Sequence, residues 1–158
     1  MPKPLNLITM TAAALASLSL AGQAAAGECP AGKTMANAMK PGATAPKDVT
    51  DDVIGSIDLG NGYNIAGKTM RMRRLVIQPG GIVPWHSHAE RPANIYVVEG
   101  GVTEYRSTCA VPIEHKAGEV AVESGDLAHW WKNNTNKKTV LISADIVATP
   151  EMMKEGGM

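Results

Sequence analysis

The sequence predicts a small all-β domain, a barrel or a sandwich built from short strands. Short apolar or alternating segments recur with a turn about every eight to twelve residues, a spacing typical of such folds. Phenylalanine is absent, so Val, Ile, Leu, Ala and the three Trp must form the core, a composition that suits aliphatic packing between strands. The 158 residues show no internal repeat and no helical domain, and their number favours one domain.

Nine segments are expected to form strands. They are 53–59, 69–79, 83–88, 94–99, 102–106, 113–115, 119–123, 127–132 and 138–147. Pro79-Gly80-Gly81 predicts a turn between the second and third. Gly100-Gly101 predicts a hairpin between 94–99 and 102–106, and Lys116-Ala117-Gly118 predicts another between 113–115 and 119–123.

The expected organisation has four parts. Residues 1–26 read as a secretory signal peptide, because Lys3 precedes an apolar run and Ala24-Ala25-Ala26 offers a small-residue cleavage site. Residues 27–52 are interrupted by Pro and Gly and predict an irregular N-terminal arm, 53–148 the β-domain, and 149–158 a flexible tail. We therefore expect a periplasmic or secreted protein, and the short apolar run disfavours the alternative, an uncleaved membrane anchor.

Cys29 and Cys109 are the two cysteines of the chain. In an exported protein they predict a disulfide that pins the arm to the β-domain. Free thiols and an intermolecular pair are the alternatives. Cys109 as a metal ligand is a weaker one, because it lies in a different segment from the histidines.

The balance of charged residues limits the classes of binding partner that we expect. Fifteen basic and fifteen acidic residues cancel, and no basic stripe suggests nucleic acid or an anionic membrane surface. No stable membrane span is expected in the mature chain. The expected partner is a small molecule, a metal ion or a second copy of the chain.

His86 and His88 form a His-x-His pair in a strand candidate, so both imidazoles point to the same face. Two neutral imidazoles on one face can provide half of a metal site. A third histidine, His129, lies in a later strand-and-turn unit. The three together are the candidate metal ligands.

The region 80–133 resembles the cupin superfamily of small β-barrels. Its first motif, a glycine, five residues, His-x-His and a later glycine, is matched by Gly80, His86, His88 and Gly100. Its second motif is matched by Gly118, His129 and Asn133. The resemblance implies a cupin-type antiparallel β-barrel, or jelly roll, with the three histidines inside.

Three positions depart from the cupin pattern. The glutamate ligand of the first motif falls on Ala93, which has no donor atom, and Ser124 and Asp126 replace the proline and glycine of the second motif. Asp tolerates turn conformations, so the second turn stays plausible. The lost glutamate leaves three histidines, with Glu90 or water as the candidates to replace it.

Three imidazoles suit Zn, Cu, Ni, Fe or Mn and leave coordination positions open for water or a substrate. A metal-dependent enzyme, of oxygenase or isomerase type, and a non-catalytic module that binds a metal or a small ligand are both consistent with this site. A structural barrel that has lost its metal site is a third interpretation.

Glu90, Tyr96 and Trp131 are candidate pocket residues, and His115, outside both motifs, is expected at the surface or rim.

Overall fold

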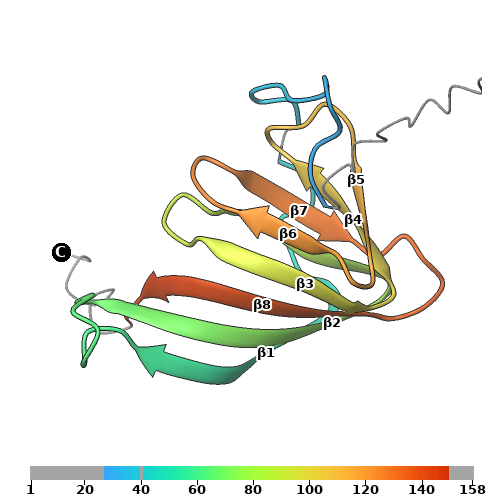
Figure 1. The fold of residues 1–158 in the computed structure, drawn as a ribbon. Coiled ribbons are helices and arrows are strands. Elements are labelled where there is room, and N and C mark those ends of the chain that lie inside the picture. The colour runs from blue at the N-terminus through green and yellow to red at the C-terminus, as the bar shows by residue number, and fades with distance from the viewer. Residues whose placement is uncertain (1–26, 40, 150–158) are drawn as a thin grey trace, which may run out of the picture.

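The computed structural model describes residues 27–39 and 41–149. The predicted signal peptide and all but the first residue of the predicted tail lie outside these ranges. Eight strands and no helix occur within them, so none of these residues belongs to a helix able to cross a membrane. The strands are β1 (Lys47–Asp58), β2 (Lys68–Ser87), β3 (Ala93–Glu99), β4 (Gly101–Arg106), β5 (Ile113–Lys116), β6 (Val120–Glu123), β7 (Ala128–Lys132) and β8 (Thr139–Ala148) (Figure 1).

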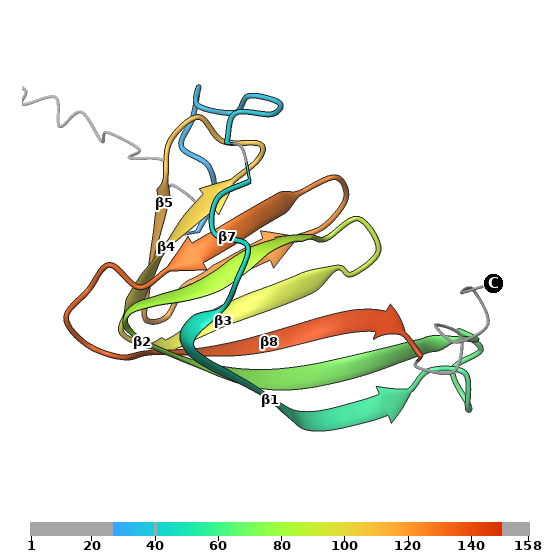
Figure 2. The same ribbon diagram turned by 180° about the vertical axis from the view of Figure 1, so that it is seen from behind.

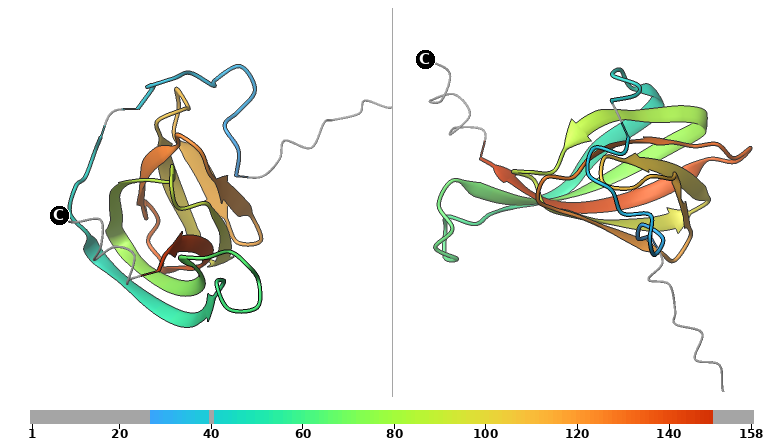
Figure 3. Two further views of the ribbon diagram at one scale, coloured as in Figure 1. Left: turned by 90° about the vertical axis from the view of Figure 1, so that its left-hand side faces the viewer. Right: turned by 90° about the horizontal axis from the view of Figure 1, so that it is seen from above.

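The strands form a nearly closed antiparallel barrel, which confirms the predicted all-β class. The hydrogen-bonded order is β5-β4-β7-β2-β8-β3-β6, and β1 adds to β2. The view along the barrel in the left panel of Figure 3 shows the strands curling around a common interior. Non-consecutive neighbours such as β4 with β7 and β3 with β8 are the crossed connections of a jelly roll.

The long strand β2 links the two halves of the barrel. Its residues 68–77 pair with β8, and its residues 82–87 pair with β7. The predicted turn at Pro79-Gly80-Gly81 is instead a bend within this one strand. Gly80 has a φ of 76°, and a Cβ on Gly81 would lie 2.7 Å from the backbone oxygen of Asp48. Glycine at both positions therefore allows the strand to bend without ending.

Both predicted hairpins are wrong. β3 pairs with β6 and β8, whereas β4 pairs with β5 and β7, so Gly100 is a corner between the two halves of the barrel. Gly118 makes a similar corner between β5 and β6. Local turn signals mark where a strand ends but not which strand it pairs with, and here the long-range pairings decide.

A continuous apolar core fills the barrel and borders the histidines. It is built from inward-facing aliphatic residues and one indole, namely Leu75, Ile77, Ala93, Ile95, Val97, Val102, Ala121, Trp131 and Leu141. Alternation along β3 explains this directly, because Ala93, Ile95 and Val97 are buried while the residues between them are exposed. The core confirms that aliphatic packing replaces phenylalanine.

The N-terminal arm packs against the loop between β4 and β5. Thr34 forms a bridge with Cys109, and the backbone N–H of Met35 donates to the carbonyl of Thr108. The predicted Cys29–Cys109 disulfide is present in the structure and fixes the start of the arm. Figure 2 shows the arm then crossing the outside of the barrel before entering β1, which begins at Lys47, earlier than the strand expected from residue 53.

Candidate metal centre

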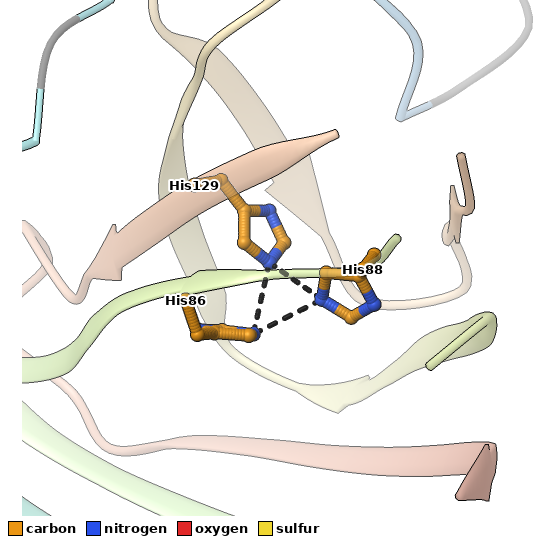
Figure 4. A group of neighbouring side chains, drawn as sticks. All are labelled: His86, His88 and His129. Carbon is orange, nitrogen blue, oxygen red and sulfur yellow. Dashed lines mark hydrogen bonds between the residues drawn. The ribbon is translucent and has the colours of Figure 1, made fainter. Parts of the chain in front are cut away.

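The barrel brings together the three histidines that were predicted to bind a metal. His86 lies near the end of β2 and is paired in register with His129 of β7, while His88 follows β2 directly. Their Nε2 atoms lie 3.0 Å (His86 to His88), 3.1 Å (His88 to His129) and 3.2 Å (His86 to His129) apart. Dashed lines join these atoms in Figure 4, where all three rings point to one centre.

Each ring is oriented by an acceptor at its other nitrogen. Nδ1 of His86 lies 2.8 Å from the carbonyl oxygen of Pro84, and Nδ1 of His88 lies 2.8 Å from that of Arg91. Nδ1 of His129 lies 2.5 Å from a carboxylate oxygen of Glu104. Because carbonyl oxygens only accept, Nδ1 of His86 and Nδ1 of His88 carry the proton and donate it. At His129 the ionised carboxylate of Glu104 accepts from Nδ1, and the indole N–H of Trp131 also lies 2.9 Å from that atom. All three Nε2 atoms then present lone pairs to the same point.

This convergence fits a metal ion. Three lone pairs cannot hydrogen-bond to one another, so a cation between them would satisfy all three at once. The indole N–H of Trp131 also lies 3.3 Å from Nε2 of His129. A nitrogen–metal bond of about 2.1 Å puts two ligand nitrogens about 3.0 Å apart at a right angle and about 3.4 Å apart at the tetrahedral angle. The observed separations of 3.0–3.2 Å fall in that range.

The electrostatic setting keeps the first two ligands neutral. Burial, with the positive charge of neighbouring groups, lowers the pKa of His86 to about 3. Burial likewise lowers the pKa of His88 to about 4. Both imidazoles are therefore deprotonated at neutral pH and available to bind a metal.

Glu104 on β4 is the centre of a buried polar cluster behind His129. Its two carboxylate oxygens accept from the guanidinium of Arg106 at 2.8 and 2.9 Å, and one of them lies 2.9 Å from Nε2 of His115. Burial alone would raise the pKa of Glu104, but the hydrogen bonds from His115, His129 and Arg106 outweigh it and hold the pKa below its ordinary range. Glu104 is thus an ionised carboxylate that fixes the ring of His129.

His115 belongs to this cluster, so the expectation of a surface or rim residue is wrong. It is 1% exposed and stacks on Trp131, with ring centroids 4.7 Å apart and planes 11° from parallel. Sequence reasoning missed it because its partner, Glu104, is supplied by the pairing of β4 with β5. The motif spacing contains no signal for that contact.

A cavity of about 220 Å³ opens beside the histidines. Trp131 contributes to its wall, as expected, together with Leu75, Val83, Ile95 and Leu141, and with the charged residues Asp51, Arg73, Arg91 and Glu123. Two other expected pocket residues lie elsewhere. Tyr96 is on the outer face and 45% exposed, because it alternates with the inward Ile95, and Glu90 is exposed outside the cavity wall.

Glu123 of β6 is a site residue that the sequence reasoning missed. One of its carboxylate oxygens lies 2.9 Å from Nε2 of His88, and the residue is 1% exposed. Burial raises the pKa of Glu123 to about 7. The alternation in the segment 119–123 predicts inward valines and outward glutamates, but Val120 and Val122 are exposed and Glu123 is buried. Its proximity to His88 depends on a strand pairing that the sequence does not reveal.

Comparison with known proteins supports the fold. Residues 73–145 match the model of the cupin domain, and these residues include the three histidines and Glu123. The cupin domain of Cnp3 from Schizosaccharomyces pombe superposes with a TM-score of 0.52 at 9% identity, covering 73% of this chain and 76% of that one. Together these findings support a cupin-type fold for this chain.

Two further proteins are similar to parts of this chain. KdgF from Halomonas sp. superposes with a TM-score of 0.52 at 11% identity, covering 66% of this chain and 84% of that one. Nectarin-1 from Nicotiana langsdorffii x Nicotiana sanderae is 32% identical over 108 residues, which are 66% of this chain and 46% of the relative. The matched segment thus spans less than half of that relative.

Proposed function

We propose that this chain is an exported cupin that binds one divalent transition metal through His86, His88 and His129 and presents it to a small molecule. The observation that carries the proposal is the convergence of three Nε2 lone pairs, each fixed by an acceptor at Nδ1. A bound metal would act as a Lewis acid toward a carbonyl or a water molecule. Zn, Cu, Ni, Fe and Mn all accept imidazole ligands, and the donor set alone does not select among them.

The cavity supports a small-molecule partner. Its volume of about 220 Å³ lies below the roughly 300–1,000 Å³ of sites for drug-sized ligands. Trp131 and aliphatic side chains would exclude water from one side, and the guanidinium groups of Arg73 and Arg91 provide polar contacts on the other. We propose a metal-dependent enzyme of oxygenase or isomerase type, with a non-catalytic binding module as the alternative.

Export is the second part of the proposal. The Cys29–Cys109 disulfide supports it, because disulfides persist in oxidising compartments. Intact-mass measurement on the protein recovered from the producing cells tests it, and a chain that begins near Gly27 is expected. A full-length chain recovered from the membrane fraction would contradict export.

Metal content decides the central part of the proposal. Protein purified without a histidine tag and reconstituted with Mn²⁺, Zn²⁺ or Ni²⁺ should retain about one ion per chain after desalting for at least one of these metals. His129→Ala should lose that ion, because it removes one of three converging donors. Glu90→Gln, which changes an exposed residue near the site, is the matched control and should retain it. Equal retention by the His129 variant would overturn the ligand assignment.

A further inference from the structure

We propose that Glu123 is the fourth protein ligand of the metal, a carboxylate supplied by β6 in place of the one that β3 lacks. The inference rests on the proposed metal site and goes beyond it, because it changes the donor set from three neutral imidazoles to three imidazoles and one anion. It also replaces Glu90, which the sequence offered as the substitute. Three independent features of the structure support it.

The first feature is strand register. Ala93, where the cupin pattern would have its glutamate, is the direct cross-strand partner of Glu123 in the antiparallel pair β3–β6. Directly opposed residues point to the same face of a sheet, and both of these are buried. A carboxylate on either member of the pair therefore enters the same part of the barrel. The sequence has an alanine at one position and a glutamate at the other.

The second feature is the position of the carboxylate itself. One oxygen of Glu123 lies 2.9 Å from Nε2 of His88, a separation like those among the three histidine nitrogens. Its other oxygen lies 3.4 Å from Nδ1 of His129. Glu123 also lines the cavity with the three histidines. The donor atoms of His86, His88 and His129 form a group within 4.8 Å that Glu123 does not join, so its carboxylate must shift toward the ion to bind it.

The third feature is the incomplete hydrogen bonding of the Glu123 carboxylate. Its Oε1 atom is buried and has no hydrogen-bond partner within the described part of the chain. Glu104, which is equally buried, shows the contrast, because both of its oxygens are bonded by Arg106 and it also contacts His115 and His129. A buried carboxylate without such partners is costly unless it takes up a proton or a cation neutralises it. The site offers a metal ion for that role.

The charge consequence concerns the chemistry of the site. Three neutral imidazoles would leave a divalent ion with its full charge, whereas Glu123 lowers the charge of the complex by one. A hard oxygen donor also favours Mn²⁺ and Fe²⁺ more than a purely nitrogen site does. The class of metal that the site retains is therefore expected to depend on residue 123.

The test moves the carboxylate across the strand pair. Mn²⁺ affinity is measured by calorimetric titration for the wild-type protein, for the single variants Glu123→Gln, Glu123→Ala and Glu90→Gln, and for the double variant Glu123→Ala/Ala93→Glu. Glu123→Gln keeps the size of the side chain and removes its charge, and it should weaken Mn²⁺ binding by about tenfold or more, the scale found for residues that support a metal site. Glu90→Gln should bind like the wild type. The double variant should bind more tightly than Glu123→Ala alone, because the carboxylate returns from β3.

The outcomes separate this inference from the metal site itself. If Glu123→Gln binds Mn²⁺ within about twofold of the wild type while His129→Ala does not bind it, Glu123 is not a ligand and the three-histidine site still stands. If Glu90→Gln instead loses affinity, the sequence-based alternative is correct. If the wild type binds neither Mn²⁺ nor any other divalent ion tested, the proposed function fails and this inference fails with it. Melting temperatures of the metal-free variants identify any that do not fold.

Discussion

At the scale of single residues, the metal site depends on how each imidazole is held. Glu104 accepts from Nδ1 of His129 at 2.5 Å and is itself paired with Arg106. Glu104→Gln should weaken metal binding by about 10- to 100-fold, because it no longer fixes the ring as a charged acceptor. It should also lower stability, because the buried guanidinium of Arg106 loses its partner. Metal titration and thermal melting measure the two effects.

The control for Glu104→Gln is Glu114→Gln, which changes an exposed glutamate on the neighbouring strand β5. Glu114 contacts the hydroxyl of Thr103 and no histidine within the structure's described ranges. The control should bind metal like the wild type. Equal affinities for all three proteins would show that Glu104 has no part in orienting His129.

The titration of the ligands gives the metal-free protein a defined pH dependence. His86 and His88 have folded-state pKa values of about 3 and about 4, below the ~6.5 of an unfolded chain, so the unfolded state binds more protons as the pH falls. Their contribution to stability is therefore present above pH ~6.5 and is lost between that value and about pH 4. Glu123, with a pKa raised to about 7, acts in the opposite direction between pH ~4.3 and 7, but it is one group against two.

We therefore expect the melting temperature of the metal-free protein to fall from pH 7 to pH 4.5. Thermal melting in the presence of a chelator measures it. The double variant His86→Gln/His88→Gln should show a smaller fall, because the two groups that drive it are removed. A wild-type melting temperature that stayed constant or rose on acidification would contradict the assignment of neutral, buried imidazoles.

At the scale of elements, the metal site depends most on β2, because the bend in this strand places His86 and His88 beside β7. A Cβ on Gly81 would lie 2.7 Å from the backbone oxygen of Asp48 and 2.8 Å from that of Gln78. Backbone atoms cannot move aside cheaply, so Gly81→Ala should lower the free energy of unfolding by about 1–3 kcal/mol. Gly55→Ala, on β1 with nothing within 4 Å of the added Cβ, should change it by less than about 0.5 kcal/mol. Urea unfolding compares the two, and similar losses would argue against the bend as the cause.

The same strands show which features of the fold and of the site could be predicted from the sequence. Strands such as β3 were predictable because apolar and polar residues recur in short segments bounded by turn residues. The three histidines were predictable because cupin spacing fixes their positions. Pairing was not predictable, since Gly100 and Gly118 mark corners in the same way as they would mark hairpins. The roles of Glu123, Glu104 and His115 depend on that pairing, which explains why residues near the ligands in sequence, such as Glu90, were chosen instead.

At the scale of the whole molecule, the arm is held by the Cys29–Cys109 disulfide, which spans 80 residues. Cys29→Ser/Cys109→Ser should lower stability by about 2–4 kcal/mol, mainly because the unfolded chain gains freedom, although the mechanism is model-dependent. Metal content should be unchanged, because the histidines lie on β2, next to β2 and on β7. Denaturant unfolding and metal analysis of the same preparation check both parts. Loss of the metal in a variant that still folds would show that the arm supports the site.

The central claim is that one metal ion lies between His86, His88 and His129, with Glu123 as its fourth protein ligand. Anomalous diffraction at the absorption edge of the metal tests it most directly, with crystals of tag-free protein grown in the presence of Mn²⁺ or Zn²⁺. The predicted result is one anomalous peak inside the barrel, about 2.0–2.2 Å from the three Nε2 atoms and from one oxygen of Glu123. Metal-saturated crystals with no peak at this position, or with their peak at the cysteines or methionines, would contradict the account.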